Sequence, residues 1–319
     1  MKKYLFSLLA GVLLSNVFVG DSNADSDGGE TNIAAIDQLI TEMKSNYVDY
    51  NERKDDGLPF TLESKDEDGE IRASVRTYFP GIEFNQFAAR LSDVSQWCEF
   101  IPLHLNIKAC GYSEDSSDLR LGFYVGAKGY TAPDEAQLLV FRVEVDEYKN
   151  FLEIGFAASK GPFGSSNYLF DFRAVEIDQG VYLEFDLSSR PGFISSLAKV
   201  YFATVGSGKV GFSTMGKDRS GRVRYVKGQR GGAERNIVRY LLSMKSYFET
   251  IEWEHESDIY ERRLDYWFDL TEQHKKQLNE MDREAYMNIK LRERNNQLLL
   301  IDSIKNNFVP DFSTDTTSQ

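Results

Sequence analysis

The sequence predicts an α+β fold, in which an antiparallel sheet packs against a long helix near the carboxyl end. Apolar and polar residues alternate along successive short segments of 103–187, with Gly, Asp, Ser or Asn in the turns, as in an antiparallel meander. Each strand has one apolar face, so helices must cover one side of the sheet. A helix at 233–251 provides that cover, because its apolar residues recur at steps of three and four.

Length and charge limit the classes of function. The chain has 319 residues, enough for one large domain or two small ones, and its 41% apolar residues allow a sizeable core. The formal net charge is −13. A strongly acidic chain is repelled by phosphate backbones, so we expect no nucleic-acid partner.

The amino end is typical of a secretory signal. A basic start at 2–3 precedes an apolar run at 4–19, and Ser-Asn-Ala at 22–24 has the small-x-small form of a cleavage site. A membrane anchor is the alternative, but a spanning helix needs about 20 apolar residues, and a polar pair at 15–16 interrupts this run. We therefore expect residues 1–24 to be a cleaved signal peptide and the protein to be periplasmic.

The cysteine content favours one disulfide. Cys98 and Cys110 are the only cysteines, and an exported protein meets an oxidising environment. A bridge across this short loop would stabilise the fold by about 3 kcal/mol in the chain-entropy model. Two separate buried thiols are the alternative, because spacing alone does not fix the geometry that a bridge needs.

The elements before the meander include both helices and strands. Residues 25–56 contain a short helix at 33–47 and a charged linker. Strands at 60–63 and 71–79 flank a turn-rich segment at 66–69, as in a hairpin.

A helical segment follows the hairpin at 83–101. It divides at Ser92-Asp93, where a fresh cap can start a second helix, and Pro102 stops it. His104 then falls on the polar phase of the first meander strand.

This order of elements resembles the START-like, or helix-grip, superfamily (SRPBCC), which includes polyketide cyclase-like proteins and lipid-transfer domains. The resemblance covers about 57–252. It is carried by Phe84…Leu91-Ser-Asp-Val-Ser-Gln-Trp97…Phe100-Ile-Pro102 and by Glu234-Arg235-Asn236…Tyr240…Tyr247. It implies a sheet curved around the last helix, with a hydrophobic cavity between the two.

Two segments lie beyond the START-like region. Apolar residues at helical spacing predict a helical extension at 253–309, either a helical hairpin on the core or a contact for a protein partner. The polar end at 310–319 is expected to be disordered.

No motif in the sequence assigns a reaction, and we expect no cofactor, no metal and no catalytic residue. The GxGxxG match at 206–211 lacks the strand before it and the helix after it that a dinucleotide site requires. The three histidines lack metal-ligand spacing. Strand carboxylates such as Asp171 and Glu184 alternate with apolar neighbours, which predicts a solvated outer face.

The function expected from the resemblance is binding or transfer of a lipid or another hydrophobic small molecule. The candidate cavity residues are Phe141, Phe170, Phe172, Phe185, Leu241, Met244 and Phe248, and the alternative for each of them is a place in the packed core. One alternative is a cyclase- or hydrolase-like enzyme that uses an inward carboxylate in the same cavity. Another is an assembly protein that acts through 253–309.

A basic segment suggests transient contact with a membrane surface. Nine basic and two acidic residues lie in 217–245, and clustered Lys and Arg attract anionic lipids. Pairing with acidic surfaces of the same chain is the alternative. The candidate headgroup residues are Arg222, Arg224, Lys227 and Arg230. The neighbouring apolar helix predicted at 193–205 and its glycine-rich exit form a candidate gate at 193–216, with Phe193, Leu197, Tyr201, Gly206 and Gly208 as its residues.

Overall fold

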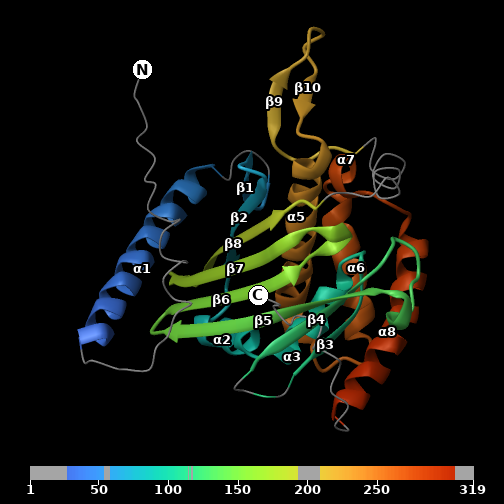
Figure 1. Cartoon of the computed structure of the whole chain (residues 1–319), viewed down its shortest axis with the longest axis horizontal. Helices are drawn as coiled ribbons and strands as arrows, with labels where there is room; N and C mark the ends of the chain where they lie inside the picture. The colour runs from blue at the N-terminus through green and yellow to red at the C-terminus, as the bar shows by residue number, and fades with distance from the viewer. Residues whose placement is uncertain (1–26, 54–57, 114, 116–117, 193–208, 306–319) are drawn as a thin grey trace. The chain divides into compact units, whose positions relative to one another are not determined.

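The computed structural model describes residues 27–53, 58–113, 115, 118–192 and 209–305 (Figure 1). The chain divides into two units, residues 1–42 and 43–319. In the first unit the described residues are helical, and they belong to the amino-terminal part of α1 (Asp27–Arg53). The sheet, the remaining helices and the candidate site all belong to the second unit.

One large, curved antiparallel sheet dominates the second unit (Figure 1). Its strand order is β1-β2-β8-β7-β6-β5-β4-β3. The meander is confirmed, because strands β3 to β8 each pair with the next in the chain. The strands are β1 (Thr61–Glu67), β2 (Glu70–Pro80), β3 (Ile107–Tyr112), β4 (Arg120–Val125), β5 (Gln137–Tyr148), β6 (Phe151–Lys160), β7 (Ser166–Ile177) and β8 (Gly180–Arg190).

The long helix α5 (Gly228–Glu249) packs against this sheet, mainly on β2. It begins five residues before the predicted start at 233, directly after the extended residue Lys227, and its first residue, Gly228, has a φ of +66°. Before α5, the short strand β10 (Val223–Tyr225) pairs with β9 (Thr214–Lys217) in a separate hairpin.

The other side of α5 is also buried. The face opposite the apolar stripe packs against α6 (Ile259–Glu272). There Ser246 donates a hydrogen bond of 2.7 Å to the carbonyl oxygen of Arg263. Ser243 is fully buried as well. The helix is therefore enclosed on both sides, which the single apolar stripe did not reveal.

The helical segment after the hairpin divides as predicted. It forms α2 (Phe84–Ser92) and α3 (Val94–Phe100), and the Asp93 carboxylate accepts a hydrogen bond of 2.9 Å from the Ser95 amide. The first meander strand begins later than predicted, at Ile107. Residues Ile101–Leu103 instead form a short 3₁₀ helix (η2), with Pro102 in its first turn.

Helix α1 is longer than the predicted helix at 33–47 and continues to Arg53, through the residues expected to form a linker. Within the second unit, its last turns pack on the outer face of the sheet. The Tyr47 ring lies 5.2 Å from that of Tyr78 and 5.6 Å from that of Tyr182. These aromatic contacts explain why charged residues there remain helical.

The carboxyl-terminal extension packs on the core. It comprises α6, α7 (Lys275–Leu278) and α8 (Arg283–Lys305), and α8 lies along the edge strand β3. The side-chain amide of Gln297 accepts a hydrogen bond of 2.6 Å from the Cys110 amide and donates one of 2.9 Å to its carbonyl oxygen. This side chain therefore takes the place of a neighbouring strand at an edge that would otherwise be open. None of the helices in the described part of the chain has the length and apolar character that a transmembrane segment needs.

The two cysteines meet between α3 and β3. The structure joins Cys98 and Cys110 in a disulfide, with their Cα atoms 5.1 Å apart. Both residues are fully buried.

We expect neither cysteine to carry a free thiol in the native protein. A thiol reagent added to the unfolded, unreduced protein should label neither cysteine, and it should label both after reduction. The paired change Cys98→Ala and Cys110→Ala should lower the free energy of unfolding by about 3 kcal/mol. Labelling of both cysteines without reduction would contradict the bridge.

Candidate functional site

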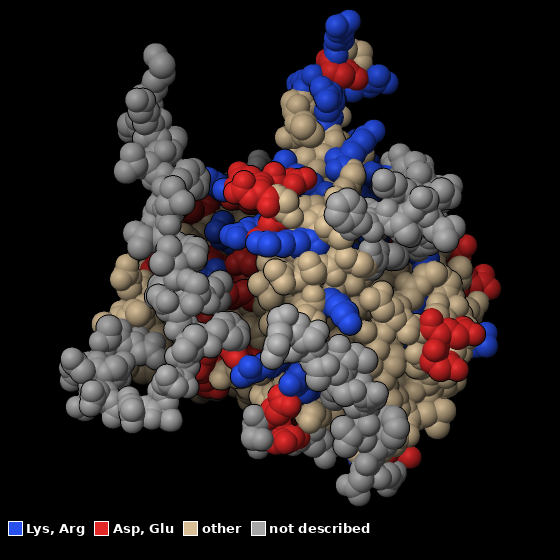
Figure 2. Space-filling view, in the orientation of Figure 1, with Lys and Arg blue, Asp and Glu red and all other residues tan. Residues whose placement is uncertain are grey.

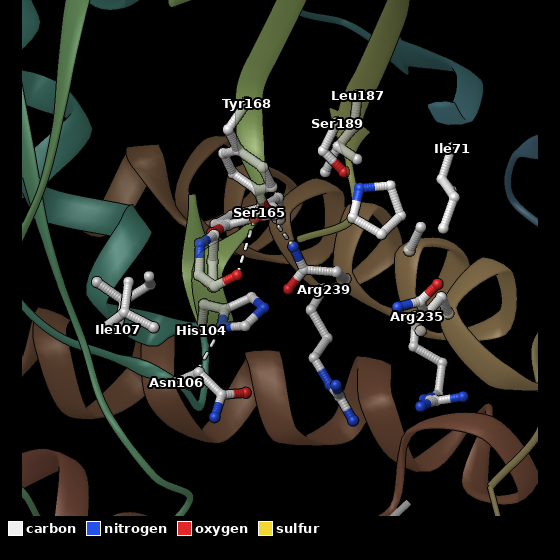
Figure 3. A pocket seen from close by; sticks show the side chains of 18 of the residues that line it. Ile71, His104, Asn106, Ile107, Ser165, Tyr168, Leu187, Ser189, Arg235 and Arg239 are labelled. Atoms are coloured by element: carbon white, nitrogen blue, oxygen red, sulfur yellow. Dashed lines mark hydrogen bonds between the residues drawn. The ribbon is translucent and has the colours of Figure 1, made fainter. Parts of the chain in front are cut away.

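A cavity of about 240 Å³ lies between the sheet and the amino-terminal half of α5 (Figure 3). Its apolar wall comes from strands that are distant in sequence, with Ile71 on β2, Ile107 on β3, Val125 on β4 and Leu187 on β8. Its polar wall comes mainly from α5 and from the segment before β3. The cavity therefore offers an apolar side and a polar side to one small molecule.

Small residues at the start of α5 leave the space open. Gly228, Gly232 and Ala233 line the cavity. A Cβ atom added to Gly232 would meet only the Nη2 atom of Arg235, at 4.0 Å. The position therefore has room for a side chain without backbone strain.

His104 lies in the polar wall and is almost fully buried, with 1% of its surface exposed. Its ring stacks on that of Tyr240, with 4.6 Å between the centroids. The Asn106 amide donates a hydrogen bond of 3.1 Å to Nδ1, so the proton of the neutral ring is on Nε2. Burial holds the pKa of His104 well below its usual value, and Arg239 and Lys290 lower it further. The ring is neutral at pH 7 and offers one N–H donor.

The carboxyl-terminal helices fix the backbone around His104. Tyr286 donates a hydrogen bond of 2.7 Å to the Leu103 carbonyl oxygen. Lys290 donates to the carbonyl oxygens of His104 at 2.9 Å and of Ile107 at 2.7 Å. His104 was expected on the polar phase of a strand, and this was wrong, because side chains of α8 take the carbonyl groups that a strand partner would use.

The buried amine of Lys290 should make stability depend on pH. Burial lowers its pKa from 10.5 to about 8 in the folded protein. Between these values the unfolded chain binds more protons, so stability should rise with pH, by up to about 3 kcal/mol from this group. Urea unfolding at pH 7 to 9.5 should show this slope in the wild type and a smaller one in Lys290→Met. Equal slopes in the two proteins would contradict the low pKa.

Tyr168 and Asn236 join the sheet to α5 at the cavity. The Asn236 amide donates a hydrogen bond of 2.9 Å to the Tyr168 hydroxyl oxygen (Figure 3). Burial raises the pKa of Tyr168, so its hydroxyl stays protonated. These groups add hydrogen-bonding capacity without charge.

The charged part of the wall consists of Arg235, Arg239, Lys128 and Glu280. Arg239 donates to the Glu280 carboxylate at 2.8 Å, and Lys128 contacts its other oxygen. These two cations hold the pKa of Glu280 below its usual value, against the effect of its burial. Glu280 is therefore an ionised carboxylate paired with two cations. Such a group is poorly suited to proton transfer at neutral pH.

The seven candidate cavity residues lie elsewhere. All are buried, and none lines this cavity. Phe172 and Phe185 stack with 4.0 Å between ring centroids, and Phe87 stacks on Phe248 at 4.5 Å. Their side chains fill the core beneath the cavity, because aromatic rings from sheet and helix pack closely there.

The basic segment divides into two parts. Arg222 and Arg224 belong to the β9–β10 hairpin, which projects from the start of α5 and carries exposed basic side chains (Figure 1, Figure 2). Lys227 precedes α5, and Arg230 donates a hydrogen bond of 2.7 Å to the Ser64 hydroxyl. The five candidate gate residues lie outside the described residues.

The outer carboxylates are less solvated than expected. Glu184 is 4% exposed and accepts hydrogen bonds from Asn46 at 2.9 Å and Arg76 at 3.3 Å. Burial raises the pKa of Asp171 to about 7, although Arg173 opposes the shift. Asp171 alternates with the inward Phe170 and Phe172, so it faces away from the cavity.

The last glycine of the GxGxxG match has a packing role. A Cβ atom on Gly211 would lie 2.2 Å from the Glu234 carboxylate oxygen Oε2, so only glycine fits. That carboxylate accepts hydrogen bonds from the amides of Phe212 at 2.6 Å and Ser213 at 3.0 Å. Glu234 is one of the residues on which the START-like resemblance rests. Its carboxylate links the segment that precedes α5, at Phe212 and Ser213, to the helix itself.

Sequence reasoning missed the cavity residues because they come from seven separate segments. One signal was present on α5, where Arg235 and Arg239 are four apart, as are Asn236 and Tyr240. This spacing places each pair on one side of a helix. Lys128 and Glu280 carried no comparable signal.

The structure is an α+β protein whose curved antiparallel sheet packs against a long carboxyl-terminal helix, an arrangement consistent with a helix grip. No protein-family model and no curated protein matches the chain.

Three solved structures show a distant similarity. CalU16 from Micromonospora echinospora is 11% identical, with 67% of this chain and 97% of that chain covered and a TM-score of 0.27. A Thermobifida fusca protein is 16% identical, with coverages of 44% and 84% and a TM-score of 0.25. A conserved protein of unknown function from Enterococcus faecalis is 10% identical, with coverages of 76% and 95% and a TM-score of 0.30. Scores this low assign neither fold nor function to this chain.

Proposed function

We propose that this is an exported, START-like protein that binds a small amphipathic molecule between the sheet and α5. The observation that supports the proposal most directly is the 240 Å³ cavity at this position, with an apolar wall on the strands and polar groups on α5. Concave sites of mixed lining, with few polar groups, are typical of small-molecule binding. The volume suits a short-chain or single-ring molecule better than a whole membrane lipid.

Titration with octan-1-ol tests this function. The eight-carbon alcohol has an apolar chain for the strand wall and one hydroxyl for the polar wall. We expect one molecule to bind per chain in isothermal titration calorimetry, and native mass spectrometry of protein purified from its host should show a bound molecule. Absence of both would contradict the proposed function.

Catalysis in this cavity has less support. The enzyme alternative requires an inward carboxylate with a raised pKa, but Asp171 faces away and the pKa of Glu280 is lowered. The Nδ1 atom of His104 already accepts the Asn106 amide, and its low pKa makes it a weak base. The described groups therefore favour binding over proton transfer.

An assembly role has one supporting feature. Leu298 and Leu299 on α8 are 49% and 68% exposed. A contact with a protein partner at this face remains a proposal. The opposite, buried face of α8 packs on β3 and forms hydrogen bonds with the backbone around His104.

We also propose transient docking of the β9–β10 hairpin on an anionic membrane. The hairpin carries Lys217, Arg219, Arg222 and Arg224 against a single acid, Asp218. Met215 and Val223 on the same hairpin are 55% and 42% exposed. Basic groups beside exposed apolar side chains suit the interface of an anionic bilayer.

Charge reversal on the hairpin should weaken binding to vesicles. The change Arg222→Glu with Arg224→Glu should reduce co-sedimentation with phosphatidylglycerol-containing vesicles about tenfold or more at low salt. Added salt should weaken wild-type binding as well. The control pair Arg72→Glu and Arg142→Glu carries the same charge change on exposed strand positions. Wild-type protein that ignores these vesicles, or equal loss in both pairs, would contradict docking through the hairpin.

A further inference from the structure

The polar end of the cavity has an excess of positive charge. Lys128, Arg235 and Arg239 line it. Lys209 lies nearby: burial lowers the pKa of its amine, and repulsion from these three cations lowers it further, against attraction by Glu280. Glu280 is the acidic residue in the lining. Its carboxylate is shared between Arg239 and Lys128.

The second nearby carboxylate does not correct this imbalance. Glu234 is fully buried, and its oxygen atoms accept hydrogen bonds from the Ser64 hydroxyl and from the amides of Phe212 and Ser213. Arg235 forms no ion pair with any described residue. Burial lowers the pKa of Arg235 to about 10, and repulsion from Arg239 adds to this shift, while Glu280 and Glu234 oppose it. The described carboxylates therefore compensate the charge on Arg235 only in part.

Three buried N–H donors at this end also lack acceptors. They are Nη1 of Arg235, Nε of Arg239 and Nε2 of His104, and none is within hydrogen-bond geometry of a described acceptor. The Asn236 side chain is near enough to His104 to raise the pKa of its ring, but its geometry leaves Nε2 open to a further acceptor. Arg239 and His104 are 6% and 1% exposed. Arg235 and Arg239 lie side by side on α5 with their side chains directed the same way (Figure 3). Buried donors are normally satisfied, so the described residues of this site leave room for a further acceptor.

We propose that the cavity recognises a carboxylate or phosphate group, which accepts hydrogen bonds from Arg235, Arg239 and His104. An anion supplies both the missing acceptors and the missing negative charge, and arginine binds either group through paired N–H donors. The remainder of the ligand packs along Ile107, Val125 and Leu187. This inference rests on the proposed function and names the chemical class of its ligand.

Three matched probes test the inference by calorimetry at pH 7.5 and low salt. Octan-1-ol, octanoate and octyl phosphate share one apolar chain and differ in the head group. Wild-type protein should bind at least one of the two anions about tenfold or more tightly than the alcohol. Arg235→Gln should reduce the affinity for that anion to the level of the alcohol and leave the alcohol unchanged. The control Arg142→Gln removes an exposed arginine from β5 and should change neither affinity.

The outcomes separate the two proposals. Equal binding of all three probes to wild-type protein would overturn the anion site and leave the cavity function standing. Binding of none would overturn the cavity function itself. The wild-type comparison decides the matter even where Arg235→Gln fails to fold. Preference for octanoate identifies a carboxylate ligand, and preference for octyl phosphate identifies a phosphate ligand.

Discussion

Replacing Glu293 with glutamine should lower the free energy of unfolding by about 3–5 kcal/mol, the usual cost of breaking a buried ion pair. The Glu293 carboxylate lies 3.0 Å from the Lys108 amine and 2.8 Å from the Lys290 amine. The three side chains are 0–2% exposed. Without the carboxylate, the two buried amines would have no counter-charge, because their other partners are neutral backbone carbonyl groups, and each would either stay charged and unpaired or lose its proton at a cost in stability.

Urea unfolding at pH 7 measures this effect. The control is Glu261→Gln, which removes an exposed carboxylate from α6 and should change stability by less than about 0.5 kcal/mol. The Glu293→Gln protein should also lose affinity for octan-1-ol, because the same lysines fix the backbone around His104. A loss below about 1 kcal/mol would show that the two lysines tolerate burial without this partner.

Gly232→Leu should abolish octan-1-ol binding while the protein remains folded. Gly232 lines the cavity, and a Cβ atom there has only the Nη2 atom of Arg235 within 4.0 Å. A leucine side chain would therefore occupy the space available to the ligand. The loss in affinity should exceed about a hundredfold, because a filled cavity must be emptied before a probe can enter.

Gly232→Ala is the matched control. It adds a single methyl group, and in a helix interior alanine is about 1 kcal/mol more favourable than glycine. We expect the alanine protein to be slightly more stable than wild type and to bind octan-1-ol within a few-fold of the wild-type affinity. Equal binding by the leucine and wild-type proteins would show that octan-1-ol binds elsewhere on the molecule.

Local patterns accounted for most of the fold. The strict alternation along β7 and β8 predicted their faces, and the structure pairs Phe172 with Phe185 in register. Asp93 predicted the division between α2 and α3 because its side chain caps the second helix. Each of these features depends on neighbours in sequence or on the two-residue period of a strand.

The candidate site was predicted less well, because its groups approach only after folding. His104 gains its burial and its tautomer from α8 and from Asn106, and α8 lies more than 170 positions away in the chain. The phenylalanines expected to line a cavity instead fill the core, because their rings are large enough to close the space between sheet and helix. The open space lies at the start of α5, where glycine and alanine leave room.

Local patterns were enough to predict the antiparallel meander, the division at Asp93 and the long helix that packs on the sheet, since hydrophobic period and capping act over short distances. Three features became visible only in the folded chain. These are the position of the cavity, the placement of Asp171 on the sheet face that points away from it, and the packing of the carboxyl-terminal helices on β3 and around His104. Burial and the pairing of charges depend on contacts between distant segments. Glu293 with Lys108, and Arg239 with Glu280, are such contacts, and no local pattern specifies them.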